Sequence, residues 1–148
     1  MVNTMLYLDT SSLLKLYIRE QVSQLVQSRV ASQDHPLPIW EIQKAELINA
    51  LRLKVFWNEI TLDQAEAQIA LFENRLKRGL YTFPEIDRIS LLKCVLRLGA
   101  ETPRLGCRTM DIFHVACAVE IGASEFLSFD QRQNALATHA GLKLTPLS

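Results

Sequence analysis

The chain has 148 residues, which is enough for one domain with a substantial buried core. Hydrophobic residues make up 49% and charged residues 22%, so the composition is that of an ordinary globular protein. The 16 basic and 16 acidic side chains give a formal net charge of zero, which excludes a protein that grips nucleic acid mainly through bulk positive charge.

The start of the sequence resembles neither a signal peptide nor a membrane span. Its apolar stretch, residues 5–8, is short and is interrupted by Asp9. The three cysteines form no CxxC pair, and two of them lie in strongly apolar helical patterns. We therefore expect reduced, mostly buried thiols in a cytoplasmic protein that is not attached to a membrane.

The first half of the chain is predicted to contain one clear strand and several helices. Residues 6–8 form a short apolar run that ends at Asp9, and the Thr-Ser-Ser that follows is typical of a helix start. Two helices are predicted next, at residues 12–18 and 21–31. A turn at 35–38 then leads past a short strand to a long helix at 40–57.

The second half alternates between helices and strands. Thr61 is predicted as an N-cap, with Gln64 at the capping-box position and Gly79 ending the helix. The remaining predicted elements are a strand at 80–83, a helix that starts at Pro84 and ends near 98, a loop at 99–106, a buried helix at 109–120, a strand at 125–129, a helix to His139 and a strand at 142–144. This alternation predicts a single α/β domain over residues 1–148, a three-layer α/β/α fold with a short parallel sheet.

Two aspartates follow predicted strands directly. Asp9 comes after Met-Leu-Tyr-Leu, and Asp130 comes after Phe-Leu-Ser-Phe. In open α/β sheets, ligands bind beyond the carboxyl ends of the strands, where both residues are expected to lie. Capping of the next helix explains either aspartate equally well when it is considered alone.

Glu46 is more informative because its helical neighbours are apolar. The residues at its i−4, i+4, i+7 and i+11 positions are Ile42, Ala50, Leu53 and Trp57. A second apolar face carries Leu47, Ile48, Leu51 and Val55. We therefore expect this helix to be enclosed on several sides, and a buried carboxylate to be protonated, paired with Arg or Lys, or bound to a metal.

Asp111 lies in the first turn of the predicted buried helix. It complements the helix dipole there, but its i+4 and i+7 neighbours, Val115 and Ala118, place it on a covered face. His114 lies one turn further on, and we interpret it as a hydrogen-bonded core residue rather than a ligand.

Asp9, Glu46, Asp111 and Asp130 are thus candidates for one acidic cluster. Converging carboxylates raise one another's pKa unless a cation lies between them. Oxygen ligands without a His/Cys set favour Mg²⁺ or Mn²⁺ over zinc, and such an ion can promote in-line attack on a phosphodiester. The spacing permits this cluster but does not establish that it forms.

At these same residues the chain resembles the PIN-domain family, particularly its VapC-like toxin ribonucleases. The four stretches that carry the resemblance are YLDTSSLLKLY at residues 7–17, ELINAL at 46–51, GCRTMDIFHVA at 106–116 and FLSFDQRQ at 126–133. They cover nearly the whole chain and come in the family's order.

The resemblance implies roles for individual residues. Asp9, Glu46 and Asp111 would hold the principal metal, and Asp130 would complete that site or help to hold a second ion. Ser128 would orient a ligand or a water molecule. The resemblance also suggests supporting or RNA-contacting roles for Thr10, Asn49 and Arg108.

The resemblance further implies a Mg²⁺- or Mn²⁺-dependent endoribonuclease, a homodimer, and a protein antitoxin whose tail fills the active-site groove. Phosphates would be held by nearby cations at Lys15, Arg52, Arg108 and Arg132, whereas Arg75, Lys77 and Arg78 are interpreted as a solvated helix face. A housekeeping nuclease of RNA processing and a non-catalytic binding module remain alternatives. A haloacid-dehalogenase-like phosphotransferase is disfavoured, because it needs an Asp-x-Asp pair where this chain has Asp9-Thr10-Ser11.

Overall fold

The computed structural model describes residues 5–146 and divides the chain into two compact units. The first, which we call the sheet unit, comprises Met1–Asp9 and Pro84–Ser148. The second, the hairpin unit, is Thr10–Phe83. The α/β class is confirmed, while the three-layer arrangement and the single domain remain predictions.

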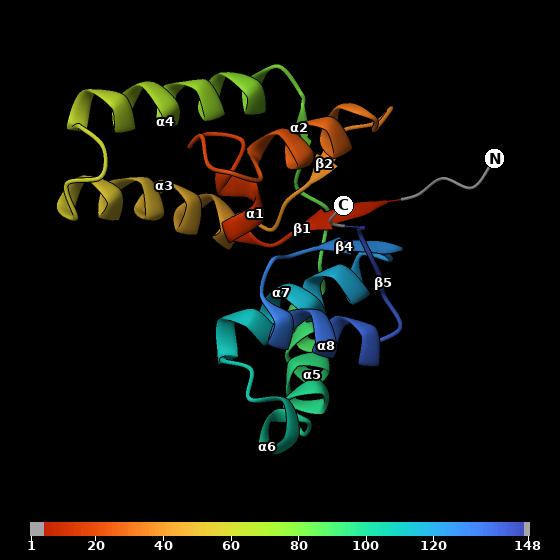
Figure 1. Cartoon of the computed structure of the whole chain (residues 1–148). Coiled ribbons are helices and arrows are strands. Elements are labelled where there is room, and N and C mark those ends of the chain that lie inside the picture. The colour runs from red at the N-terminus through yellow and green to blue at the C-terminus, as the bar shows by residue number, and fades with distance from the viewer. Residues whose placement is uncertain (1–4, 147–148) are drawn as a thin grey trace. The chain divides into compact units, whose positions relative to one another are not determined.

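The sheet unit contains a parallel sheet of three strands (Figure 1). Its strands are β1 (Leu6–Leu8), β4 (Glu125–Leu127) and β5 (Lys143–Leu144), in the order β1-β4-β5. All residues of β1 and β4 are buried. Tyr7 of β1 lies opposite Phe126 of β4, and their rings stack with centroids 5.8 Å apart. The carboxyl ends of β1 and β4 therefore lie side by side.

Helices complete the sheet unit. They are α5 (Arg88–Gly99), α6 (Thr102–Leu105), α7 (Thr109–Glu120) and α8 (Gln131–His139). Helix α7 packs against both α5 and α8. Its residues Ile112 and His114 to Ala118 are buried, which confirms the predicted core helix and its bounds.

The hairpin unit is built around two long helices that lie side by side in Figure 1, α3 (Glu41–Phe56) and α4 (Leu62–Lys77). Two shorter helices precede them, α1 (Thr10–Leu14) and α2 (Ser23–Ala31). A two-stranded parallel sheet pairs β2 (Leu37–Pro38) with β3 (Tyr81–Thr82).

The boundaries of α4 follow from its sequence signals. Thr61 accepts a hydrogen bond from the Gln64 amide at 3.1 Å, and the Gln64 side chain accepts one from the Thr61 amide at 2.8 Å. Gly79 adopts φ +79°, a left-handed conformation that suits glycine after a helix end. The predicted capping box and helix end are confirmed.

Some predicted boundaries were wrong. Pro84 does not start a helix, because Asp87 caps α5 instead by accepting a hydrogen bond from the Ser90 amide at 3.1 Å. The predicted loop at 99–106 contains the short helix α6, which has proline at its start and Gly106 in a left-handed conformation at its end. Within residues 5–146, no helix is long and apolar enough to cross a membrane.

Candidate active site

Asp9 and Ser128 follow the paired strands β1 and β4. The Asp9 amide donates to the Leu127 carbonyl at 3.2 Å, which extends the strand pairing by one residue. The Asp9 side chain lies 3.1 Å from the Ser128 hydroxyl, measured from Oδ2 to Oγ. Both residues are buried, with exposed fractions of 5% and 2%. A carboxylate is therefore held at the carboxyl edge of the sheet with little access to solvent.

Ser128 connects this edge to the start of α8. Its Oγ lies 2.7 Å from Oε1 of Gln133 and accepts a hydrogen bond from the Asp130 amide at 3.0 Å. Because the hydroxyl has one hydrogen, it donates to either Gln133 or Asp9 at one time. Gln133 also donates from Nε2 to the Asp111 carbonyl at 3.2 Å. Gln133 thus links the backbone of α7 to the serine that follows β4.

Asp130 caps α8, as one of the two sequence interpretations had it. Its Oδ1 accepts from the amides of Arg132 and Gln133, at 2.9 and 3.1 Å. Its Oδ2 forms no hydrogen bond with any residue in the described range 5–146. Capping therefore occupies one oxygen of this exposed carboxylate and leaves the other for a ligand.

Asp111, in the first turn of α7, is electrostatically coupled to the other two aspartates of the sheet unit. Burial raises the pKa of its carboxyl group, and the negative charges of Asp130 and Asp9 raise it further. The charges of His114 and Arg108 oppose these effects only in part. The structure therefore brings three of the four predicted acidic residues into one electrostatic neighbourhood, which we call the acidic site: Asp9, Asp111 and Asp130.

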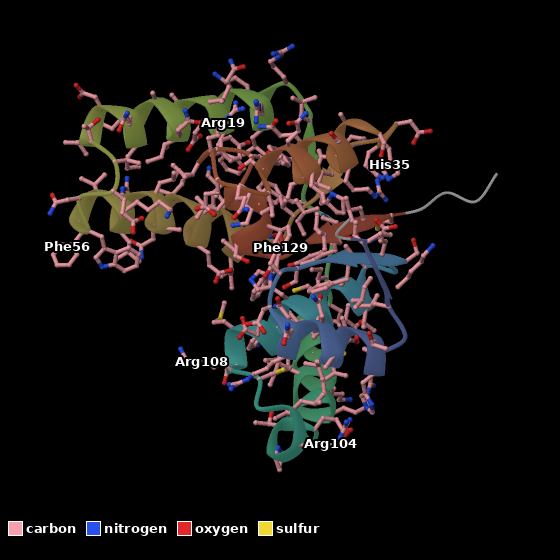
Figure 2. All side chains as sticks on the ribbon, viewed as in Figure 1. Arg19, His35, Phe56, Arg104, Arg108 and Phe129 are labelled. Atoms are coloured by element: carbon pink, nitrogen blue, oxygen red, sulfur yellow. The ribbon has the colours of Figure 1, made fainter. Side chains whose placement is uncertain are left out.

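An open cleft of about 430 Å³ gives access to this site. It is lined by Gly106, Cys107, Arg108, Asp111, Asp130, Gln131 and Arg132. Arg108 stands at the start of α7 and is labelled in Figure 2. Burial and the nearby charges of Asp111 and Asp130 raise the pKa of the Cys107 thiol. The lining of this cleft therefore combines two arginines with two aspartates, although the chain as a whole has no net charge.

The oxygen donors of the acidic site match the preference of Mg²⁺ and Mn²⁺. A group of three or more His, Cys, Asp or Glu side chains with the spacing of a formed metal site is nevertheless absent from the described part of the chain. The donor types thus fit a hard divalent ion. Burial and the charges of Asp130 and Asp9 raise the pKa of Asp111, and a bound cation would oppose both effects.

Glu46 belongs to the hairpin unit, where it is half-buried and accepts a hydrogen bond from the Thr10 hydroxyl at 2.8 Å. Thr10 is the residue that follows Asp9 in the chain. The expected enclosure of this helix was wrong, because only one of its two apolar faces is covered. Leu47 and Leu51 are fully buried, whereas the face that carries Glu46 ends in Trp57, which is 56% exposed.

Three other residues from the sequence analysis have surroundings that the structure describes. Asn49 is exposed on α3 and forms no hydrogen bond within residues 5–146. Lys15 pairs with Glu20 at 2.5 Å. The core role predicted for His114 is confirmed, because the residue is buried and its Nδ1 lies 2.7 Å from the Tyr7 hydroxyl.

Sequence reasoning assigned no role to Gln133, although the structure places it at the centre of the Ser128 network. It is 1% exposed, three positions after the capping Asp130. An Asp-x-x-Gln pattern normally indicates a capping box, in which the glutamine bonds back to the cap residue. Here the Gln133 side chain instead contacts the Ser128 hydroxyl and the Asp111 carbonyl, so the sequence pattern predicts a different contact from the one that forms.

Comparison with known proteins adds no assignment. The sequence matches no model of a known protein family, and a search of curated proteins finds no significant match.

Proposed function

We propose that this chain is a Mg²⁺- or Mn²⁺-dependent endoribonuclease of the PIN type. The observation that carries the proposal is the position of Asp9 and Asp130 after two paired parallel strands, near enough to Asp111 on α7 for their charges to raise its pKa. Ligand sites of open α/β folds lie beyond the carboxyl ends of such strands. Three carboxylates there disfavour an anionic ligand unless a cation accompanies it, and a divalent ion beside a phosphodiester meets that requirement.

The residues of the acidic site and its cleft would have separate roles in holding the ion and the RNA. Asp9 and Asp111 would hold the ion, and the second oxygen of Asp130 would complete its ligands. Ser128 would fix the orientation of Asp9. Arg108 would bind phosphate groups at the cleft, as would Arg132 on the same cleft wall. The bound ion would supply a more acidic water and neutralise charge on the phosphate.

Glu46 enters the proposal from its motif and its contact with Thr10, the neighbour of Asp9 in sequence. From its motif we propose Glu46 as a metal ligand, with Asn49 one helical turn away as a contact for RNA. The hydroxyl of Thr10 would hold the Glu46 carboxylate in place. The Glu46→Gln variant therefore tests the role of Glu46 separately from the roles of the aspartates in the sheet unit.

The first experiment is cleavage of a structured RNA by the purified, folded chain, with Mg²⁺, with Mn²⁺ and with EDTA. We expect cleavage with either ion, and at least about a hundredfold slower cleavage for Asp9→Asn and Asp111→Asn. Glu85→Gln is the matched control, because Glu85 is an exposed carboxylate of the same unit and forms no ion pair with any residue that the structure describes. Absence of cleavage with both ions, from protein free of bound inhibitor, would refute the proposal.

A second measurement tests ion binding without RNA. A protein that binds Mn²⁺ only when folded gains about 2.7 kcal/mol of stability at 100 times the dissociation constant. We expect Mn²⁺ to raise the melting temperature of the wild type and to leave that of Asp9→Asn nearly unchanged. A wild type whose stability ignores Mn²⁺ would instead favour the non-catalytic binding module.

The toxin assignment within this proposal comes from the resemblance to VapC-like proteins. It predicts a homodimer, a cognate antitoxin that blocks the cleft, and growth arrest upon expression. Sequencing of RNA ends after induced expression distinguishes it from a processing nuclease. A toxin produces cuts in one tRNA or one ribosomal loop, whereas a processing nuclease leaves ends across many transcripts.

A further inference from the structure

A second and larger cleft lies entirely within the hairpin unit. Its volume is about 610 Å³, within the roughly 300–1,000 Å³ range of small-molecule sites. Apolar side chains supply much of its wall, among them Leu16, Val30, Leu37 and Leu80. These come from α2, β2 and the segments that follow α1 and α4, so the wall is built from four separate parts of the unit.

Arg75, in the last turn of α4, brings a positive charge to this apolar cleft. Sequence reasoning placed this residue on a solvated helix face, and that interpretation was wrong. Its guanidinium lies over the Tyr17 ring, 5.1 Å from the ring centroid, and its side chain is partly buried. No carboxylate within residues 5–146 forms an ion pair with it.

The groups beside Arg75 are neutral phenols. The hydroxyls of Tyr17 and Tyr81 are hydrogen-bonded to each other, and both phenols are neutral at pH 7, since burial raises their pKa above the already high ordinary value of tyrosine. Burial disfavours the charge of Arg75, but the two phenol oxygens outweigh it and raise its pKa. Arg75 therefore keeps a full positive charge that is not neutralised by its neighbours.

The acidic side chain of the cleft lining lies toward solvent. Asp34 is the acidic residue of the cleft lining, and its side chain is 75% exposed. It lies 2.9 Å from Nδ1 of His35, which follows α2 and is labelled in Figure 2. The cleft thus combines apolar walls, an uncompensated guanidinium and a polar mouth.

From this arrangement we propose that the hairpin unit binds a small aliphatic carboxylate, with the carboxylate on Arg75 and the alkyl chain along Leu16, Val30 and Leu37. A carboxylate supplies the missing counter-charge and accepts paired hydrogen bonds from a guanidinium. The alkyl chain covers apolar surface that would otherwise face water. The proposal concerns residues of the hairpin unit alone and does not depend on the nuclease activity.

The test is calorimetric titration of the full chain with octanoate. We expect saturable binding at one site, and at least about tenfold weaker binding of 1-octanol, which keeps the chain but lacks the charge. Arg75→Met is expected to weaken octanoate binding about tenfold or more and to leave octanol binding unchanged. Arg78→Met is the matched control, because Arg78 is an exposed cation three residues further on that forms no ion pair among residues 5–146.

Ala31→Phe provides an independent variant, since it adds bulk to the cleft from an exposed position on α2 and leaves Arg75 in the sequence. It should abolish binding of both probes while the circular dichroism spectrum stays that of the wild type. Equal binding of octanoate and octanol, unchanged binding by Arg75→Met, or no binding of octanoate at millimolar concentration would each overturn the proposal. So would a peptide with an apolar C-terminal residue that binds more than tenfold tighter than octanoate, because the occupant would then be a protein terminus.

Discussion

Replacing Ser128 by alanine tests the network that holds the acidic site together. The variant removes the hydroxyl that lies 2.7 Å from Gln133 Oε1 and accepts from the Asp130 amide. Each neutral hydrogen bond is worth about 1 kcal/mol, and a buried group left without a partner costs about 1–3 kcal/mol. Since Gln133 is almost fully buried, we expect a loss of about 3 kcal/mol in the free energy of unfolding. For a chain of this length that corresponds to a melting temperature lower by roughly 6–12 °C.

The assay is urea unfolding followed by circular dichroism. Ser124→Ala is the matched control, because its exposed hydroxyl lies 3.4 Å from the Met5 carbonyl, and it should cost less than about 0.5 kcal/mol. A double variant isolates the coupling. The Gln133→Leu variant lacks Oε1, the oxygen that Ser128→Ala would leave without its partner. In that background Ser128→Ala should therefore cost at least about 1 kcal/mol less than it does in the wild type. Additive losses, or a single-variant loss below about 0.5 kcal/mol, would refute the reasoning.

Three further predictions concern other contacts. Asp111→Asn should stabilise the metal-free protein at pH 7, because the raised pKa of Asp111 means that its charged form disfavours the folded state. This penalty is absent below the ordinary aspartate pKa and grows as pH rises, so melting temperatures of wild type and variant should converge toward pH 3 and separate by pH 7. Thr61→Ala removes the cap that accepts from the Gln64 amide and should cost about 1 kcal/mol in urea unfolding, with Gln64→Ala not adding its full effect. Tyr7→Phe removes the hydroxyl that lies 2.7 Å from Nδ1 of buried His114, so it should cost about 1 kcal/mol by the same assay, and no measurable loss would contradict a stabilising role for this contact.

Elements with strong local signals were predictable from the sequence. The predicted bounds of the buried helix agree with α7, Thr109–Glu120, because its apolar residues continue around most of the helix. The start of α5 was wrong for a local reason. Proline is favoured in a first helical turn, but Asp87 binds both the amide and the hydroxyl of Ser90 and so fixes the helix start after it.

Long-range features were harder to predict. An apolar stripe shows that a helix face tends to be covered, but it does not show what covers it, and for this reason the exposed face of α3 was misjudged. The strand-end rule located Asp9 and Asp130, since it depends only on the parallel sheet. The role of Gln133 depends on where α7 passes α8, which no local pattern encodes.

The chain order of the two units has a consequence for synthesis. The hairpin unit is continuous, so all of its residues have been made once the chain reaches Phe83. The sheet unit is formed from two separate stretches of the chain, so Leu6 cannot pair with Glu125 until β4 has been synthesised. At translation rates of about 5–20 residues per second, Asp9 exists for roughly 6–24 s before Asp130 is added. The acidic site therefore cannot assemble until β4 and the residues after it have been synthesised, many seconds after the residues of the hairpin unit are complete.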